Sequence, residues 1–264
     1  MEVAMNDFEV LVLGVGDSFS EHHHPTSLLL RAEGMCLAID CPDMYRAVLG
    51  SAVRGAVRGA GPQSGVSSLT VDDVDHVLLT HVHGDHMNGL EGLAFYKHFV
   101  QRKRVVLATS PDVRRVLWNE RLAVSMGQLW NGTELVRKSF EDYFEYVPLD
   151  WDLPTSLGPF RIHTRRTLHH VPTSALLIEV GGKLLGYSCD TAFDPDLIEF
   201  LSPADLIIHE TNHGPAHTPY AALAALPEEL RRRMRLIHYP DGFDVTQSTI
   251  RCLEEGELLR VGAA

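Results

Sequence analysis

Short apolar runs that stop at glycine or polar residues recur along the chain, a pattern typical of strands separated by turns. The first run, 8–14 (FEVLVLG), stops at Gly14, and runs at 27–31 and 35–40 flank a turn at Glu33-Gly34. The same pattern predicts further strands at residues 75–80, 104–109, 143–149, 160–164, 174–180, 183–188, 205–209 and 235–239. The predicted strands fall into two groups along the sequence.

Helical spacing of apolar residues appears between these strands. Residues 43–59 carry apolar side chains three and four positions apart, which predicts an amphipathic helix, and further helices are predicted at 90–100, 111–117 and 195–201. In 218–226 (TPYAALAAL), we expect Thr218 to cap a helix with Pro219 at its first position. The segment 59–68 (GAGPQSGVSS) is rich in glycine and serine and is predicted to form a loop. Because no linker separates the two groups of strands, we expect one α/β domain spanning residues 1–264.

Composition narrows the classes of partner. The 264 residues include 35 acidic and 23 basic side chains, and this net charge of −12 disfavours stable nucleic-acid binding. No apolar run approaches the roughly 20 residues that a membrane span needs. The N-terminus lacks the basic and apolar regions of a signal peptide, and the few, scattered cysteines do not form a disulfide framework. We therefore expect a reduced, cytoplasmic protein.

The 15 histidines are concentrated where they can bind a metal. Residues 80–86 (THVHGDH) directly follow the apolar run 75–80. On an extended backbone His81 and His83 point the same way, and a turn at Gly84 would bring Asp85 and His86 round to a second position. Imidazole with carboxylate suits Zn²⁺, with Mn²⁺ or Fe as alternatives. The spacing disfavours the alternative of a polar loop with chance histidines.

The H-x-H-x-D-H motif after an apolar strand resembles the signature of the metallo-β-lactamase superfamily. Asp40 after MCLAI, His169 in HHVP, Asp190 in YSCDT and His238 in LIHYP resemble its other motifs. The resemblance implies an αββα sandwich with two metal ions, here two Zn²⁺ per chain, in a cleft at the sheet edges. It implies that His81, His83 and His169 hold one ion, that Asp85, His86 and His238 hold the other, and that Asp190 bridges them. The H-x-x-P register favours His169 over His170.

Residues 204–219 (ADLIIHETNHGPAHTP) resemble the H-E-A-T element and the later histidine of the ribonuclease Z-like branch of that superfamily. By that resemblance His217 contacts the phosphate and protonates the leaving oxygen. The predicted catalytic residues are His217 and Asp85. His209 and Glu210 could orient the metal ligands or His217. Residues 22–24 (HHH) could reach the cleft, with a solvated loop as the alternative, and for His213 a structural role is the alternative.

Two departures from ribonuclease Z bear on the substrate. Only 20 residues separate His169 from Asp190, which leaves no room for the arm that grips tRNA. With the negative net charge, this disfavours tRNA 3′ processing. The layout is similar to anti-Pycsar phosphodiesterases, which implies a hydrolase of small or cyclic nucleotide phosphodiesters. A dizinc lactonase, lactamase or thioesterase is the alternative, and it would not need His217.

The segment 118–145 matches no predicted element of the sandwich. Its large apolar residues have no evident place in the core: Trp118, Leu122, Met126, Leu129 and Trp130. Aromatic residues and methionine are enriched at protein interfaces, and ribonuclease Z-like proteins commonly pair. We expect a homodimer, with the alternative that this segment folds onto its own core.

Overall fold

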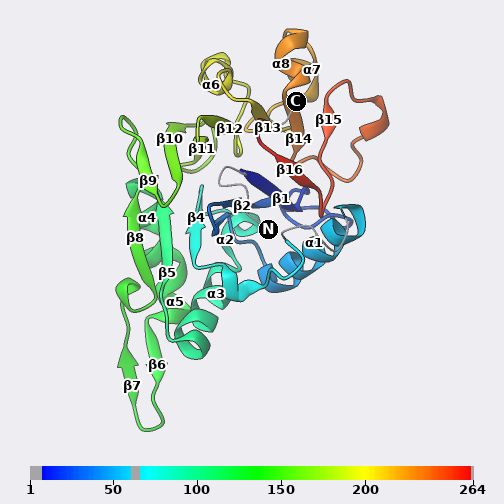
Figure 1. Cartoon of the computed structure of the whole chain (residues 1–264). Helices are drawn as coiled ribbons and strands as arrows, with labels where there is room; N and C mark the ends of the chain where they lie inside the picture. Colours follow the sequence, from blue (N-terminus) through cyan, green and yellow to red (C-terminus); the bar gives the residue numbers. More distant parts are fainter. Residues whose placement is uncertain (1–7, 61–65, 263–264) are drawn as a thin grey trace.

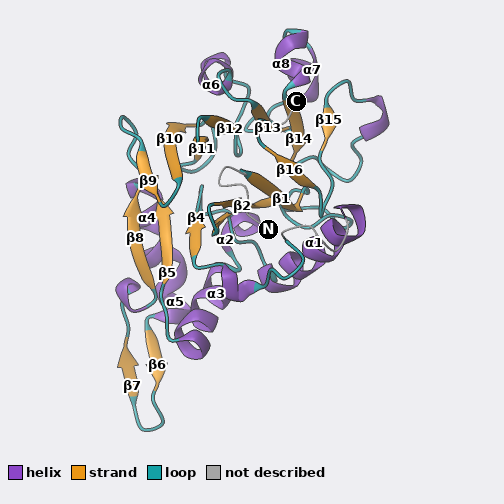
Figure 2. Ribbon diagram, viewed as in Figure 1, coloured by secondary structure: helices purple, strands orange, loops and turns teal. Residues whose placement is uncertain are grey.

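Two seven-stranded sheets stack face to face, with helices on their outer faces, in the computed structural model, which describes residues 8–60 and 66–262 (Figures 1 and 2). Most of the N-terminal stretch discussed above, residues 1–7, and part of the predicted loop, residues 61–65, lie outside the described residues. The architecture is the predicted αββα sandwich.

The first sheet has the strand order β16-β1-β2-β3-β4-β5-β8. Its strands are β1 (Glu9–Gly14), β2 (Ser27–Ala32), β3 (Met35–Ile39), β4 (His76–Leu78), β5 (Val105–Thr109), β8 (Phe144–Pro148) and β16 (Leu258–Arg260). Strands β3, β4, β5 and β8 run parallel to one another. Since carboxyl ends of parallel strands share one sheet edge, Asp40 after β3 and His81 after β4 emerge at the same edge.

The second sheet has the order β15-β14-β13-β12-β11-β10-β9. Its strands are β9 (Thr155–Leu157), β10 (Phe160–Arg166), β11 (Ser174–Val180), β12 (Lys183–Tyr187), β13 (Leu206–Glu210), β14 (Met234–Ile237) and β15 (Arg251–Cys252). Here β12 to β15 are parallel. The residues Asp190, Glu210 and His238 therefore follow or end three neighbouring strands at one edge.

The helices divide between the outer faces of the two sheets (Figure 2). The helices are α1 (Tyr45–Ala60), α2 (Gly84–Met87), α3 (Leu90–Tyr96), α4 (Pro111–Val116), α5 (Ala123–Met126), α6 (Pro195–Leu201), α7 (Tyr220–Ala224) and α8 (Glu228–Arg232). On β1, Val10 and Val12 belong to the core between the sheets, whereas Leu11 and Leu13 belong to the core under α1 to α5. A strand buried on both faces must be apolar throughout, which explains the continuous run FEVLVLG.

The segment 118–145 folds mainly onto the chain itself. Leu122 and Met126 are buried in the core under the first group of helices, and Trp118 and Leu129 pack against it. Trp130 is different, because it is 64% exposed. It lies on a hairpin, β6 (Gln128–Trp130) and β7 (Leu135–Arg137), which projects away from the sandwich (Figure 1).

Two predicted helices differ from the structure. The helix expected at 90–100 is α-helical only to Tyr96 and continues as a π-helical turn, Lys97–Gln101. The helix expected from Thr218 begins at Tyr220 with Pro219 as its N-cap, and it has only five residues. The prediction was wrong because the Thr218 hydroxyl donates instead to the Thr191 carbonyl, at 2.9 Å. None of the helices in the described part of the chain has the length and apolar character of a membrane span.

Candidate metal centre

The histidine loop leaves β4 in an extended conformation and turns into α2. His83 is the N-cap residue of this short helix, with φ −67° and ψ 151°, and His86 lies within it. Gly84 does not need a positive φ here. A Cβ at Gly84 would lie 2.7 Å from the side-chain nitrogen of the exposed residue Asn88, which would have to move. Three rings from this loop therefore converge on one place, called the centre below: His81 and His86, which are fully buried, and His83, which is partly exposed.

Three imidazoles meet on one side of the centre. The His83 Nδ1 atom lies 3.2 Å from His81 Nε2 and 3.0 Å from His169 Nε2. The adjacent His170 is exposed, whereas the His169 ring nitrogen faces the centre. The structure thus brings His169, and not His170, to His81 and His83.

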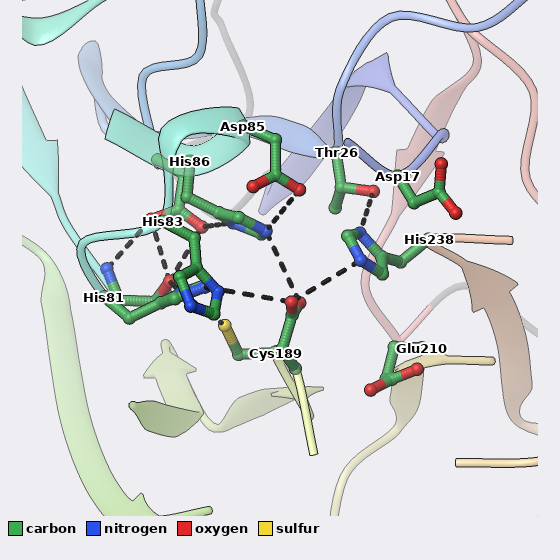
Figure 3. Close-up of polar contacts among 12 residues, drawn as sticks. Asp17, Thr26, His81, His83, Asp85, His86, Cys189, Glu210 and His238 are labelled. Atoms are coloured by element: carbon green, nitrogen blue, oxygen red, sulfur yellow. Dashed lines mark hydrogen bonds and ion pairs between the residues drawn. The ribbon is translucent and has the colours of Figure 1, made fainter. Parts of the chain in front are cut away.

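Asp190 lies among the rings that come from both sheets. Its carboxylate oxygens are 3.7 Å from His81 Nε2, 3.4 Å from His86 Nε2, 3.6 Å from His169 Nε2 and 3.4 Å from His238 Nε2. Figure 3 shows the rings of His81, His86 and His238 converging from separate elements. A carboxylate in this position can contact two cations at once.

On the other side of the centre, Asp85 and His238 flank His86. The Asp85 carboxylate lies 3.5 Å from His86 Nε2. Ligand atoms lie within 4.8 Å of one another in each of two sets, His81-His83-His169-Asp190 and Asp85-His86-His238. They contain the residues that the resemblance assigned to each ion, and two further groups, His81-His86-Cys189 and Asp190-His217-His238, overlap with them, so the assignment of ligands to each ion stays a prediction.

The donor atoms fit divalent cations. His86 Nε2 and Asp190 Oδ1 are buried and have no hydrogen-bond partner among the described residues. Such orphaned polar atoms are costly unless something else satisfies them. Burial also lowers the pKa of His81 well below its usual value and lowers the pKa of His169 to about 4. Both rings are therefore neutral at pH 7, and the neutral imidazole is the form that binds metals.

The electrostatic field at the centre favours a cation. Burial by itself would lower the pKa of His86, yet the Asp190, Asp85 and Asp40 carboxylates around it raise that pKa well above its usual value. These three carboxylates are nine-tenths or more buried at the side chain. A buried site with this much negative charge needs a counter-charge, which a divalent ion supplies.

Hydrogen bonds from behind fix the orientation of the rings. His86 Nδ1 donates to Asp40 Oδ2 at 2.8 Å, and Asp40 is itself held by the Thr80 backbone N–H and hydroxyl. His238 Nδ1 donates to the Thr26 hydroxyl oxygen at 3.1 Å. Each bond engages the nitrogen that faces away from the centre. Sequence reasoning missed Thr26 and Thr80, although Thr80 directly precedes the histidine motif.

Left-handed backbone conformations at three strand ends help to aim the site residues. Asp40 after β3, Cys189 after β12 and His238 after β14 have φ values of 63°, 51° and 57°. Residues other than glycine adopt this conformation at a steric cost, and it concentrates at functional sites. Cys189 Sγ lies 3.7 Å from His81 Nδ1, and the kink at Cys189 precedes Asp190.

His217 stands beside the centre and is held by a buried acid. Glu210, at the end of β13, accepts hydrogen bonds from His217 Nδ1 at 2.9 Å and from the Thr191 N–H at 2.7 Å. The His217 ring is stacked on His238, with ring centroids 5.5 Å apart. His209 has no comparable role, because its Nδ1 bonds the Glu210 carbonyl within the buried strand. Of the two residues predicted to orient His217, Glu210 does so.

A cleft of about 710 Å³ opens over the centre. His170 and His213 lie on its wall, together with Asp17 and Asn212, whose side chains are joined by a 2.8 Å hydrogen bond. The histidines at 22–24 do not face it. His23 packs edge-on against Tyr239, and His24 lies by Glu255, so the solvated-loop alternative holds for this segment.

The sandwich and the site have counterparts in known proteins. The metallo-beta-lactamase fold protein YhfI from Bacillus subtilis superposes with a TM-score of 0.73 at 18% identity, covering 97% of this chain and all of that one. This confirms the predicted fold class.

The sequence itself is similar to two groups of proteins. The Anti-Pycsar protein Apyc1 of Paenibacillus sp. (strain J14) is 29% identical over 240 residues, which cover 88% of this chain and 89% of that protein. The cAMP/cGMP-dependent 3′,5′-cAMP/cGMP phosphodiesterase B of Dictyostelium discoideum is 26% identical over 275 residues, 96% of this chain but 22% of that protein. Residues 8–257 match the family described as Anti-Pycsar protein Apyc1, and the chain therefore belongs to that family.

Proposed function

We propose that this chain is a metal-dependent phosphodiesterase that hydrolyses small cyclic nucleotides. One observation carries the proposal: His217, fixed by the buried Glu210 carboxylate, stands beside a centre of converging imidazoles and carboxylates. The names of the relatives support the substrate class, since one is an Apyc1 protein and another a cAMP/cGMP phosphodiesterase. Hydrolysis of a lactone, lactam or thioester would not need a histidine in this place.

The ligand assignment follows the two sets of atoms. His81, His83 and His169 would hold one Zn²⁺, and Asp85, His86 and His238 a second, with Asp190 between them; Mn²⁺ or Fe is the alternative. Divalent cations at such a site supply positive charge to the phosphoryl oxygens and activate water as the nucleophile.

Proton transfer is assigned to His217, with Glu210 behind it, and to Asp85. Glu210 engages His217 through Nδ1, which leaves Nε2 free to donate to the departing ester oxygen as the P–O bond breaks. The oxygen of water forms the new P–O bond, and the Asp85 carboxylate, on the wall of the cleft, accepts the proton that this water loses. The cyclic diester opens to a nucleoside monophosphate.

The test separates chemistry from metal binding. His217→Ala is expected to keep its metal content while kcat on a 3′,5′-cyclic nucleotide falls by about 10²–10⁴-fold, the usual contribution of a general acid. On a p-nitrophenyl ester the loss should be smaller, because p-nitrophenolate departs without protonation. Glu210→Gln, which keeps an acceptor for the Thr191 N–H, should lose less than His217→Ala. Equal losses on both substrates would remove His217 from the mechanism.

We also propose a homodimer and a cytoplasmic location. Trp130 and Leu135 are directly opposite residues of the β6–β7 hairpin and are 64% and 62% exposed, which makes the hairpin a candidate contact. Light scattering at micromolar concentration should give twice the chain mass for the wild type. Trp130→Lys should lower the measured mass toward that of the monomer. A monomeric mass for the wild type would reject the dimer.

A further inference from the structure

A second hollow adjoins the metal cleft, between the start of α1 and the face of α3. It has a volume of about 750 Å³ and its walls are largely apolar, with Met44, Val71, Leu93 and Tyr96 among the lining residues. The Arg46 guanidinium lies over the Tyr96 ring, 5.3 Å from its centroid. We refer to this hollow as the α1–α3 groove. Volumes of 300–1,000 Å³ are usual for small-molecule sites.

The groove is continuous with the metal cleft. Asp43 and Asn88 line both hollows, and the Asn88 amide lies 3.3 Å from the Asp43 carboxylate. Asn88 follows α2 directly, so the groove begins within one helical turn of Asp85 and His86. A ligand whose phosphate sits at the centre can therefore extend across Asp43 and Asn88 into the groove.

Met44 on the lip of the groove has no structural explanation in the helix it precedes. Its carbonyl accepts the first hydrogen bonds of α1, from the Ala47 and Val48 N–H groups, yet its side chain cannot cap a helix as Ser or Asp would. It adopts φ 54°, an uncommon conformation for a large residue, and its side chain is 76% exposed. Strain combined with an exposed apolar side chain beside a site indicates a function in binding.

The groove also has an open floor. Gly92 lies on the exposed face of α3, and a Cβ built there would meet nothing within 4 Å. Glycine inside a helix costs about 1 kcal/mol relative to alanine, so helix stability does not account for it. Without a side chain at this position, the groove stays open beside Gly92.

We propose that the α1–α3 groove binds the base of the cyclic nucleotide, with Met44 against its face and Asp43 and Asn88 at its polar edge. A base is planar, apolar on its faces and rich in donors and acceptors at its rim, which matches an apolar groove with a carboxylate and an amide at its mouth. The inference rests on the proposed function, because it takes the phosphodiester at the metal centre as its starting point.

Gly92→Phe fills the groove and tests the inference. We expect it to raise the KM for a 3′,5′-cyclic nucleotide, and the Kd of its non-hydrolysable phosphorothioate analogue measured by calorimetry, by at least about tenfold, or about 1.4 kcal/mol. The matched control is Gly59→Phe, another exposed helical glycine with open space around its Cβ but outside the groove. It should leave both constants unchanged.

Met44→Gly provides a second variant in case Gly92→Phe folds poorly. Glycine tolerates φ 54°, so the free energy of unfolding should not fall, while the Kd of the analogue should rise several-fold. A loss of stability together with unchanged binding would assign Met44 a purely structural role and overturn the inference.

The part of the metal cleft outside the groove offers the competing place for the base. Phe19 lines the cleft there and is 88% exposed. If Phe19→Ala weakens binding and Gly92→Phe does not, the base lies over the β1–β2 loop and the groove is excluded. If the wild-type protein turns over cyclic nucleotides and Gly92→Phe has the same KM and Kd as the wild type, the groove is overturned and the proposed function stands. A wild-type protein that neither binds nor hydrolyses them overturns the proposed function as well.

Discussion

The two sheets contribute to the metal centre in different ways. The first sheet provides His81, His83, Asp85 and His86 from one stretch of six residues between β4 and the end of α2. The second sheet provides single residues from separate connections, at positions 169, 190, 217 and 238. One contribution is a local motif, and the other depends on how four strand ends and their loops are packed.

The difference shows in what holds each part. The first part is supported by the buried Asp40, which bonds both Thr80 and His86. In the second part each residue has its own support. His169 Nδ1 bonds the Ala216 carbonyl at 3.1 Å, and His238 bonds Thr26. A defect in the second part should therefore displace one ligand, whereas loss of Asp40 should disturb the loop and the helix together.

The largest effect is expected where the two parts meet. Asp190→Ala removes the carboxylate that faces rings from both sheets, and metal content should fall from about two ions per chain to one or fewer. Since metal assistance is worth several kcal/mol, phosphodiesterase activity should fall by about 10³-fold or more. Elemental analysis and initial rates measure the two effects. Unchanged metal content in a folded variant would contradict the bridging role.

A pair of neighbouring histidines sharpens the comparison within the second part. His169→Ala should lower both metal content and activity, because its Nε2 faces His83 and Asp190. His170→Ala should keep the metals, because the ring is exposed on the cleft wall. The two variants are compared by elemental analysis and by turnover on the same phosphodiester. The reverse pattern would mean that the register of this loop is wrong.

A smaller effect is expected from the residues behind the rings. Asp40→Asn cannot satisfy both Thr80 and His86, and metal affinity should fall by about 10–100-fold, the range for such supporting residues. Thr26→Val removes the support of His238 alone among the site histidines, together with a hydrogen bond to the Gly16 carbonyl, and its loss of metal affinity should lie near the lower end of that range. Titration against a zinc chelator measures both. A greater loss of metal affinity in Thr26→Val than in Asp40→Asn would contradict the expected difference between the two parts of the centre.

The sequence was sufficient wherever structure follows from local pattern. Strand β11 was predicted with its observed bounds, as was α6, and the side chains that the resemblance named as ligands lie close together, while their binding of metal stays a prediction. The short strands β6, β7, β9, β15 and β16 were missed, because two or three residues carry too little periodicity to be recognised. The Thr-Pro start signal at 218 misled because a tertiary hydrogen bond to Thr191 competed with capping.

Other features of the site could be read from the sequence only in part or not at all. The left-handed conformations of Asp40, Cys189 and His238 are imposed by the packing of strand ends, and none of these residue positions carries a glycine that would signal them. The link between Glu210 and His217 was anticipated only as one alternative. The α1–α3 groove depends on the approach of two helices, which residue pattern does not specify.

The most direct test of the function is hydrolysis by the metal-loaded protein of a 3′,5′-cyclic nucleotide, a lactone and a β-lactam, each compared with chelator-treated protein. The cyclic nucleotide should be converted to a nucleoside monophosphate, detected by chromatography, and chelation should abolish this turnover. Rapid lactone or β-lactam hydrolysis with no conversion of the cyclic nucleotide would contradict the assignment of the centre to phosphodiester chemistry.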